Sequence, residues 1–223
     1  VPCIVGTRTT TRDLHDGTMV TVDGARGEVV SGVVEDTPSV SVSEPGRPAP
    51  APAEVTGTKV YVNLAMPDTA ESVAAQHVDG VGLLRAEFML TEALGGRHPR
   101  DLIAHGEQGT LVEKRVSSVG RIAAAFSPRP VVYRATDFRS NEFRGLTGGE
   151  AYEPVEHNPM IGYRGCYRYV SEPDLFALEL GALARVREQS PNVVLMIPFV
   201  RTRWELEACM SLVDASPLGR QRG

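Results

Sequence analysis

Apolar residues follow two different spacings along residues 58–223. Short apolar runs of strand length alternate with longer stretches in which apolar residues recur every three or four positions. Strands that alternate with helices are typical of a parallel sheet with right-handed crossovers. We therefore predict an α/β fold, either a doubly wound sheet or a (β/α)8 barrel. The predicted strands are KVYVNLAM, VGLLRAEFM, PVVYRATD and NVVLMIPFV, and the predicted helices cover residues 68–77, 101–126 and 171–186 and begin again near Trp204.

Polar side chains stand at or just beyond the C-terminal ends of these strands. They are Asn63, Arg85, Glu87, Arg134, Asp137 and Arg201. Enzymes with (β/α)8 barrels assemble their sites at that end, with one or two residues from each strand. No GxGxxG or GxxxxGK[ST] sequence follows a strand, so the chain offers no nucleotide-binding fingerprint. The pattern favours the barrel.

The first part of the chain has a different pattern. In MVTVDGARGEVVSGVV, apolar and polar residues alternate on both sides of a turn that contains Asp23 and Gly24, which predicts a β-hairpin within residues 1–36. Residues 37–57 are rich in Pro, Ser and Ala and show no periodicity. Such a composition is typical of an extended linker, so we predict a domain boundary there. Asp68, followed by Glu71, is predicted to cap the helix after the first barrel strand, and Ser171 to cap a later helix.

Composition and charge limit the possible classes of protein. The 223 residues carry a net charge of −5, which argues against a nucleic-acid or anionic-membrane partner. No apolar run approaches the roughly 20 residues of a membrane helix, and the first residues lack a signal peptide's pattern. The three cysteines form no CxxC pair, so we expect reduced thiols, no zinc site and a cytoplasmic location. The chain opens without Met and ends after a helical stretch, and we expect it to be an internal fragment.

Two arginines are the main candidates for chemistry. Arg85 and Arg134 lie among apolar residues of successive strands, where a buried cation is costly unless an anion meets it. One possibility is a structural pair with a carboxylate such as Glu87 or Asp137. The other is a shared ligand, because two guanidinium groups at one barrel mouth suit a small molecule with carboxylate and phosphate groups. We predict that both arginines bind substrate.

Three further residues are weaker candidates for the same site. Asp137 ends the strand of Arg134, where it would orient an arginine, reach the ligand or cap a turn. Asn158 and Arg164 lie in EHNPMIGYRGCYRYV, where they would either line the site or brace the loop. The other loop arginines, Arg144 and Arg168 among them, are expected to be solvated or paired at the surface. No histidine, cysteine or serine has the spacing of a catalytic or metal-binding set, so we expect no catalytic residue and no metal ligand in this chain.

Six segments, taken in order, resemble the barrel of the PEP-utilising enzymes. They are GTKVYVNLAMP, DGVGLLRAEFML, GGRHPRDLI, VVYRATDFRSNEFRGLTGG, YEPVEHNPMIGYRG and VVLMIPFVRT. Within that family the HPR element, the TDF.SNE run and the MIPFVRT strand are most similar to the pyruvate, water dikinase (phosphoenolpyruvate synthase) branch. The start of the chain, up to GEVVSG, is similar to the end of the family's swivelling phosphohistidine domain. The resemblance implies that residues 1–36 end that domain and that residues 58–223 form roughly the first half of a partial (β/α)8 (TIM-type) barrel.

The resemblance also implies a reaction. Pyruvate, ATP and water become phosphoenolpyruvate, AMP and phosphate through a phosphohistidine intermediate, with Mg2+ required. Arg85 and Arg134 match the family's substrate-binding arginines, and Asn158 and Arg164 match its NPM.G.RG loop. The full-length protein is expected to be a homo-oligomer.

Several parts of the family's machinery have no counterpart in this sequence. They are the phosphohistidine motif, the ATP-grasp domain, the Mg2+-binding carboxylates and the proton-donating cysteine. The resemblance therefore implies that the chain alone is inactive. Two alternatives stay open at this point: another family member, namely pyruvate phosphate dikinase or enzyme I, and a non-catalytic remnant.

Overall fold

The computed structural model describes residues 3–24, 26–34 and 57–221, and the chain divides into two compact units, residues 1–52 and 53–223. The smaller unit contains helix α1 (Thr10–Asp13) and the strands β1 (Val20–Asp23) and β2 (Glu28–Ser31). The strands pair antiparallel with Val20 opposite Ser31, which confirms the predicted hairpin. Apart from Gly57, the predicted linker lies outside the described residues.

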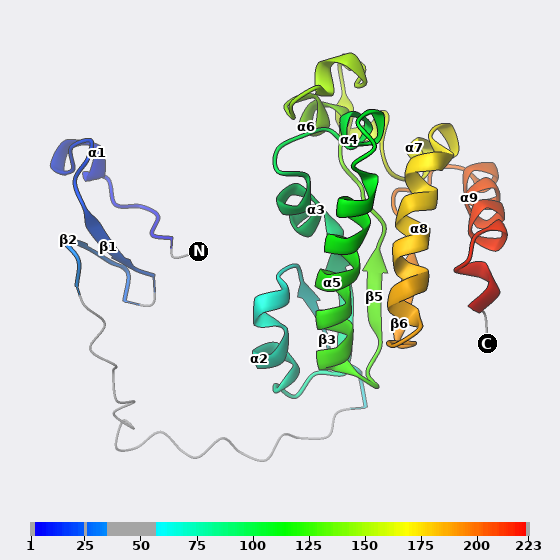
Figure 1. The fold of residues 1–223 in the computed structure, drawn as a ribbon. Helices are drawn as coiled ribbons and strands as arrows, with labels where there is room; N and C mark the ends of the chain where they lie inside the picture. Colours follow the sequence, from blue (N-terminus) through cyan, green and yellow to red (C-terminus); the bar gives the residue numbers. More distant parts are fainter. Residues whose placement is uncertain (1–2, 25, 35–56, 222–223) are drawn as a thin grey trace. The chain divides into compact units, whose positions relative to one another are not determined.

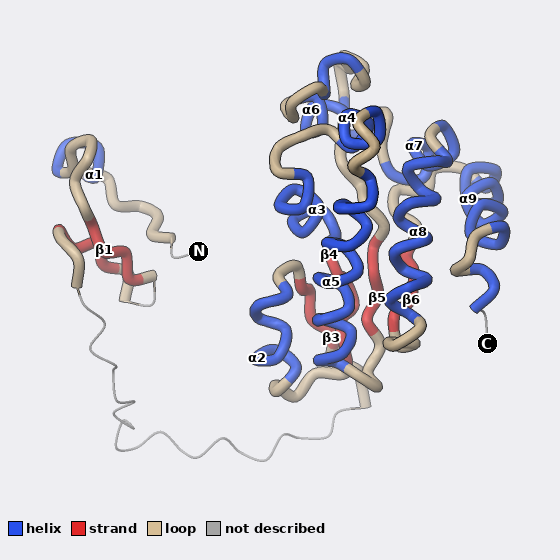
Figure 2. The backbone as a smooth tube through the Cα atoms, in the orientation of Figure 1, coloured by secondary structure: helices blue, strands red, loops and turns tan. Residues whose placement is uncertain are grey.

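The larger unit (residues 53–223) is built on a parallel sheet. Its four strands are β3 (Tyr61–Leu64), β4 (Gly80–Arg85), β5 (Val131–Arg134) and β6 (Val193–Met196). They lie in sequence order, each parallel to the next (Figure 2), and the parallel pairing confirms what the alternation of strands and helices predicts. Among the described residues β3 and β6 are therefore the two edges of the sheet.

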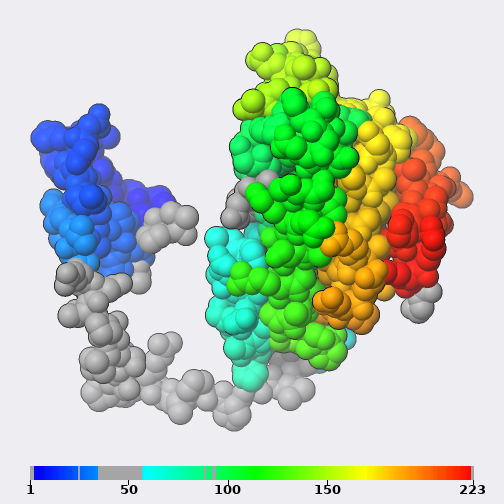
Figure 3. Space-filling model, in the orientation of Figure 1, coloured from blue at the N-terminus to red at the C-terminus, as the bar shows by residue number. Residues whose placement is uncertain are grey.

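Helices connect successive strands and lie against the sheet. Figure 1 shows α5 and α8 side by side across one face, and Figure 3 shows their atoms forming a continuous surface. The elements are η1 (Pro67–Thr69), α2 (Ala70–Ala74), α3 (Ala86–Leu94), α4 (Pro99–Ala104), α5 (Gln108–Phe126), α6 (Ser140–Arg144), η2 (Gly149–Ala151), η3 (Pro159–Ile161), α7 (Gly165–Ser171), α8 (Pro173–Arg187), α9 (Arg203–Ala215) and η4 (Gly219–Gln221).

Strand periodicity separates a covered face of the sheet from an open one. Val131 and Tyr133 of β5 are fully buried in the core, together with Val193 of β6. Successive strand residues point to opposite faces of a sheet, so the residues next to these three in sequence face away from that core. Val194 and Met196 on the other face of β6 are exposed. The sheet thus buries one face under its helices and leaves part of the other accessible.

A buried carboxylate joins the core to the end of β5. Glu179 of α8 is 2% exposed and accepts hydrogen bonds from the hydroxyls of Tyr133 and Tyr169, at 2.5 and 2.7 Å, and from the backbone N–H and hydroxyl of Thr136. Arg115 of α5 lies 3.6 Å from the same carboxylate. Burial raises the pKa of Tyr133 well above its ordinary value, so this hydroxyl stays a neutral donor. The cluster links α5, α8 and the segment that leads into Asp137.

Three local predictions are wrong. VGLLRAEFM is not one strand, because β4 ends at Arg85 and α3 begins at Ala86. Asp68 does not cap a helix: η1 begins at Pro67, and the Asp68 carboxylate instead pairs with Arg121. Ser171 is the last residue of α7, and α8 begins directly after Glu172 with a proline in its first turn, where a missing N–H costs nothing.

Candidate functional site

Two arginines end neighbouring strands at the same level. Arg85 is the last residue of β4 and Arg134 the last residue of β5, and the two are register partners. Because the strands are parallel, both side chains start from the C-terminal edge of the sheet. The arrow of β5 in Figure 1 points toward the end of the unit that carries α4, α6 and α7. The structure therefore brings together the two arginines that the sequence singles out.

A cavity of about 350 Å³ opens at this edge. Most of its lining residues are charged, so we call it the polar cavity, and they come from β4, α3, β5, α6 and the loops around η3. Of the predicted site residues, it contains Arg85, Arg134, Asp137 and Arg164. The other lining residues are Glu87, Thr91, Phe138, Arg139, Glu142 and Met160.

Arg85 is exposed, and it makes no hydrogen bond or ion pair with any described residue. The expectation that it is buried among apolar neighbours is wrong, because it is the last residue of its strand and leaves the sheet at the cavity. Its guanidinium is available to an anion without first breaking an ion pair. A planar group of this kind can bind a carboxylate or a phosphate through two parallel hydrogen bonds.

Arg134 is held by Glu87. Its Nη2 donates to Glu87 Oε1 at 2.7 Å, and the two side chains are 25% and 14% exposed. The same oxygen accepts the backbone N–H of Asp137 at 3.0 Å. The carboxylate pair considered for a strand arginine therefore exists, but it involves Arg134 and leaves Arg85 out.

Arg164 and Asp137 form a two-pronged ion pair across the cavity. Arg164 Nε and Nη2 donate to the two carboxylate oxygens of Asp137 at 2.9 and 2.7 Å. This hydrogen bonding raises the pKa of the Arg164 guanidinium. Nη1 donates to the carbonyl of Met160, and the guanidinium lies 4.3 Å above the ring of Phe199. Both predicted residues are thus at the site, and each neutralises the other.

Gly165 is required where this loop meets the segment after β6. Its φ is +54°, which an L side chain rarely adopts, and a Cβ there would lie 2.7 Å from the Cβ of Phe199 and 2.8 Å from the carbonyl oxygen of Pro198. Phe199 itself has a φ of +49°, which is uncommon for a bulky residue. The close approach holds the Arg164 loop against the end of β6.

Asn158 does not line the cavity. Its side-chain oxygen accepts the N–H of Met160 at 3.2 Å and caps η3, so it braces the loop, one of the two roles predicted for it. Arg139 and Glu142, which the sequence did not indicate, form an ion pair at the start of α6 and line the cavity. Only their position in the RSNE stretch that follows Asp137 would have suggested them.

Arg168 is buried, so the prediction that it is solvated or paired at the surface is wrong. It is 4% exposed and donates to both oxygens of Glu153 at 2.6 and 2.8 Å. Nε2 of the buried His98 lies 2.9 Å from Glu153, while its Nδ1 accepts the N–H of Arg100. Burial raises the pKa of Glu153, but hydrogen bonds from His98 and Arg168 outweigh it and hold the pKa below its usual value. This cluster stabilises the loops around η2.

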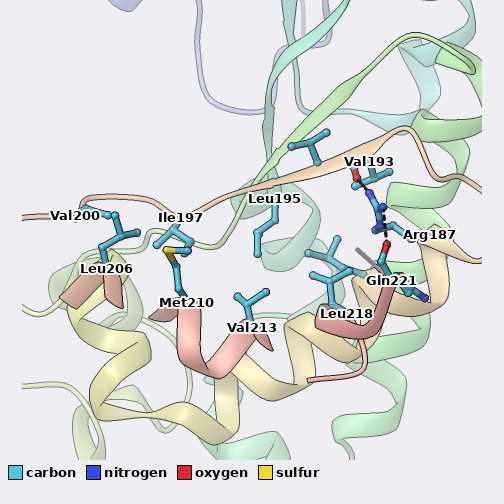
Figure 4. Close-up of a pocket in the computed structure, with 12 residues that line it drawn as sticks. Arg187, Val193, Leu195, Ile197, Val200, Leu206, Met210, Val213, Leu218 and Gln221 are labelled. Atoms are coloured by element: carbon cyan, nitrogen blue, oxygen red, sulfur yellow. Dashed lines mark hydrogen bonds between the residues drawn. The ribbon is translucent and has the colours of Figure 1, made fainter. Parts of the chain in front are cut away.

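A second, apolar groove of about 670 Å³ runs along the free edge of β6. Val193, Leu195 and Ile197 line one wall, and Met210, Val213 and Leu218 line the other (Figure 4). Arg187 closes one end by donating to the carbonyls of Val193 and Gln221. The groove lies between β6 and α9, and Arg187 is the one charged residue among those that line it.

Two structural findings bear on metals and membranes. Among the described residues, no three His, Cys, Asp or Glu side chains come close enough together to hold a metal ion. Within the same residues, none of the helices combines the length and apolar character needed to cross a bilayer.

Comparison with known proteins decides the family. The model of the PEP-utilising enzyme, PEP-binding domain matches residues 46–217. The chain belongs to the PEP-utilising enzymes. It is 43% identical over 99% of its length to a probable phosphoenolpyruvate synthase of Staphylothermus marinus, and 42% identical over its whole length to the phosphoenolpyruvate synthase of Aeropyrum pernix. Identity to the phosphoenolpyruvate synthase of Pyrococcus furiosus is 45% over 90% of the chain.

The PEP-utilising relatives are much longer than this chain, which spans 28%, 28% and 25% of their respective lengths. The resemblance predicted from the six segments is confirmed. The polar cavity lies within the part of the chain matched by the PEP-binding domain.

Proposed function

We propose that this chain supplies the phosphoenolpyruvate- and pyruvate-binding part of a longer phosphotransferase of the pyruvate, water dikinase type. That enzyme would convert pyruvate, ATP and water to phosphoenolpyruvate, AMP and phosphate through a phosphohistidine. The observation that carries the proposal is the pair of register-matched arginines, Arg85 and Arg134, at the rim of one cavity. The names of the relatives favour this reaction over those of pyruvate phosphate dikinase and enzyme I.

The proposed roles follow from the hydrogen-bond donors that each arginine still has available. Arg85 offers its whole guanidinium, and Arg134 offers the donors that Glu87 does not take. Together they would bind the phosphate and carboxylate of a three-carbon acid and stabilise charge as the phosphoryl group moves. Asp137 and Arg164 would form the rim and exclude water, and Asn158 would brace the loop behind them. No residue of this chain is assigned a catalytic role.

The architecture supports a partial barrel as the fold behind this site. In a (β/α)8 barrel, helices cover the outside of a parallel sheet, and ligands bind at the C-terminal ends of the strands. The larger unit has four consecutive parallel strands, helices against one face, and a free β6 edge beside an apolar groove. We propose that it is roughly the first half of such a barrel. The hairpin unit would then end a swivelling phosphohistidine domain, with residues 37–57 as the linker.

ATP, Mg2+, homo-oligomer formation and a cytoplasmic location belong to the proposal for the whole protein. They rest on the resemblance to the family. The resemblance places the magnesium ligands in other parts of the longer protein, and among the described residues no three His, Cys, Asp or Glu side chains come close enough together to hold a metal ion. For the same reason we expect the isolated chain to bind ligand without turning it over.

Calorimetric titration of phosphoenolpyruvate into the chain tests the proposal. We expect binding that weakens at least tenfold in Arg85→Ala and in Arg134→Ala, because a hydrogen bond to a charged group contributes about 1.5–3 kcal/mol. Arg185→Ala is the matched control, since this arginine pairs with Glu113 on the surface between α5 and α8. Equal affinity in all four proteins would show that the two arginines do not bind the ligand.

A further inference from the structure

Glu87 reaches from one strand end to the next. It lies two residues after Arg85, in the first turn of α3, where a carboxylate is favoured by the helix dipole. Its Oε1 accepts from Arg134 Nη2 at 2.7 Å and from the backbone N–H of Asp137 at 3.0 Å. One oxygen therefore holds both the side chain that ends β5 and the backbone that follows it.

This arrangement makes the two arginines unequal. Arg134 is held before any ligand arrives, whereas Arg85 contacts no described carboxylate. Glu87 Oε2 and Arg134 Nε are both buried and have no hydrogen-bond partner among the described residues. The pair is thus incompletely satisfied, and its geometry depends on a single charge-assisted hydrogen bond.

A long arginine side chain loses much rotational freedom when it binds a ligand. A side chain that is already held in the binding conformation avoids part of that loss, and this preorganisation strengthens binding. Glu87 also lowers the local positive charge, which weakens attraction for an anion. Glu87 therefore favours binding by holding Arg134 in place, while its negative charge acts against binding of an anion.

We propose that Glu87 is a positioning residue that fixes the Arg134 guanidinium for a phosphorylated carboxylic acid. The proposal rests on the proposed function for the identity of the ligand. Arg85 then has the mobile side chain, which contacts the ligand after Arg134 has bound it. Removal of the Glu87 side chain should weaken binding through Arg134 alone.

The first test needs no ligand. Nitrogen-15 relaxation of arginine Nε–H groups in the chain should show a rigid Arg134 and a mobile Arg85, with order parameters on either side of about 0.6. In Glu87→Ala the Arg134 signal should become as mobile as that of Arg85. If Arg134 is already mobile in the unsubstituted chain, or stays rigid in Glu87→Ala, the proposal is overturned whatever the ligand is.

The second test is a double-mutant cycle read by phosphoenolpyruvate titration. Glu87→Ala should weaken binding about tenfold, the low end of the range found when the partner that orients a metal ligand is removed. In an Arg134→Ala background the same substitution should have no further effect, because Glu87 acts through that arginine. Glu87→Gln should restore most of the affinity, since its amide oxygen can still accept both hydrogen bonds.

Glu113→Ala serves as the control, because it removes a glutamate from an exposed arginine pair far from the cavity. If the losses of binding free energy are additive in the cycle, Glu87 stabilises the fold without acting through Arg134, and the proposal is overturned. If the unsubstituted chain does not bind phosphoenolpyruvate, the proposed function fails, and the relaxation experiment still decides the role of Glu87.

Discussion

Replacing Glu179 with Gln is expected to destabilise the larger unit by about 3–5 kcal/mol, because removal of one partner leaves the other charge buried without compensation. The carboxylate accepts hydrogen bonds from Tyr133, Thr136 and Tyr169 and lies 3.6 Å from Arg115. Glutamine has a single acceptor oxygen, and its NH2 group would meet hydroxyls that now donate. The substitution thus removes the charge that balances a buried arginine and also disturbs the hydrogen bonds around it.

The chain contains a matched control between the same two helices. Glu113 of α5 pairs with Arg185 of α8 at 2.6 Å, with both side chains about half exposed. Exposed pairs of this kind contribute about 0–1 kcal/mol, so Glu113→Gln should have little effect. The two substitutions make the same chemical change and differ in burial.

Urea unfolding followed by circular dichroism gives both free energies by linear extrapolation. Glu179→Gln should lower the urea midpoint and leave the slope of free energy against urea unchanged. Its loss of unfolding free energy should exceed that of Glu113→Gln by at least about 2 kcal/mol. If the two variants agree within about 1 kcal/mol, the buried carboxylate does not hold the helices together as described. A changed slope would instead show that the compactness of one state had altered.

Three other predictions concern Gly165, Glu153 and the three cysteines. Gly165→Ala should cost roughly 1–2 kcal/mol for the left-handed backbone alone, and an unchanged urea midpoint would contradict the positive φ at this position. Glu153 has a lowered pKa, so its stabilisation is present above the unfolded value and is lost as pH falls through the folded value. Thermal midpoints between about pH 7 and pH 3 should therefore fall less steeply in Glu153→Gln, and equal slopes would refute this. Cys3 is exposed and should react at once with a thiol reagent, whereas burial raises the pKa values of Cys166 and Cys209, which should react only on unfolding. Equal rates for all three thiols would argue against that burial.

Periodicity along the chain was sufficient to predict the framework. The hairpin around Asp23, the four parallel strands and the long helices between them all follow from apolar spacing, whereas the order of the strands in the sheet does not. The boundaries at Arg85 and Ala86 do not. A short apolar run has no distinct period, and RAEFM satisfies a buried strand as well as the first turns of a helix.

The site was predictable to the level of strand ends and no further. Parallel strands bring their C-terminal residues to one edge of the sheet. Arg85 and Arg134 end neighbouring strands in register, which is why they were identified together. Which carboxylate meets which arginine depends on side-chain reach between elements. Glu87 is two residues from Arg85 in sequence yet pairs with Arg134. Arg168 is buried because the loop that follows η2, 15 residues earlier in the sequence, supplies Glu153.

Four arginines surround the polar cavity, and carboxylates already match three of them, which leaves a surplus of one positive charge. A ligand with both a phosphate and a carboxylate carries more negative charge than this surplus. The occupied cavity would therefore change sign and become a net anion. That net negative charge would attract a further cation, so we expect salt and divalent ions to influence the affinity for such a ligand.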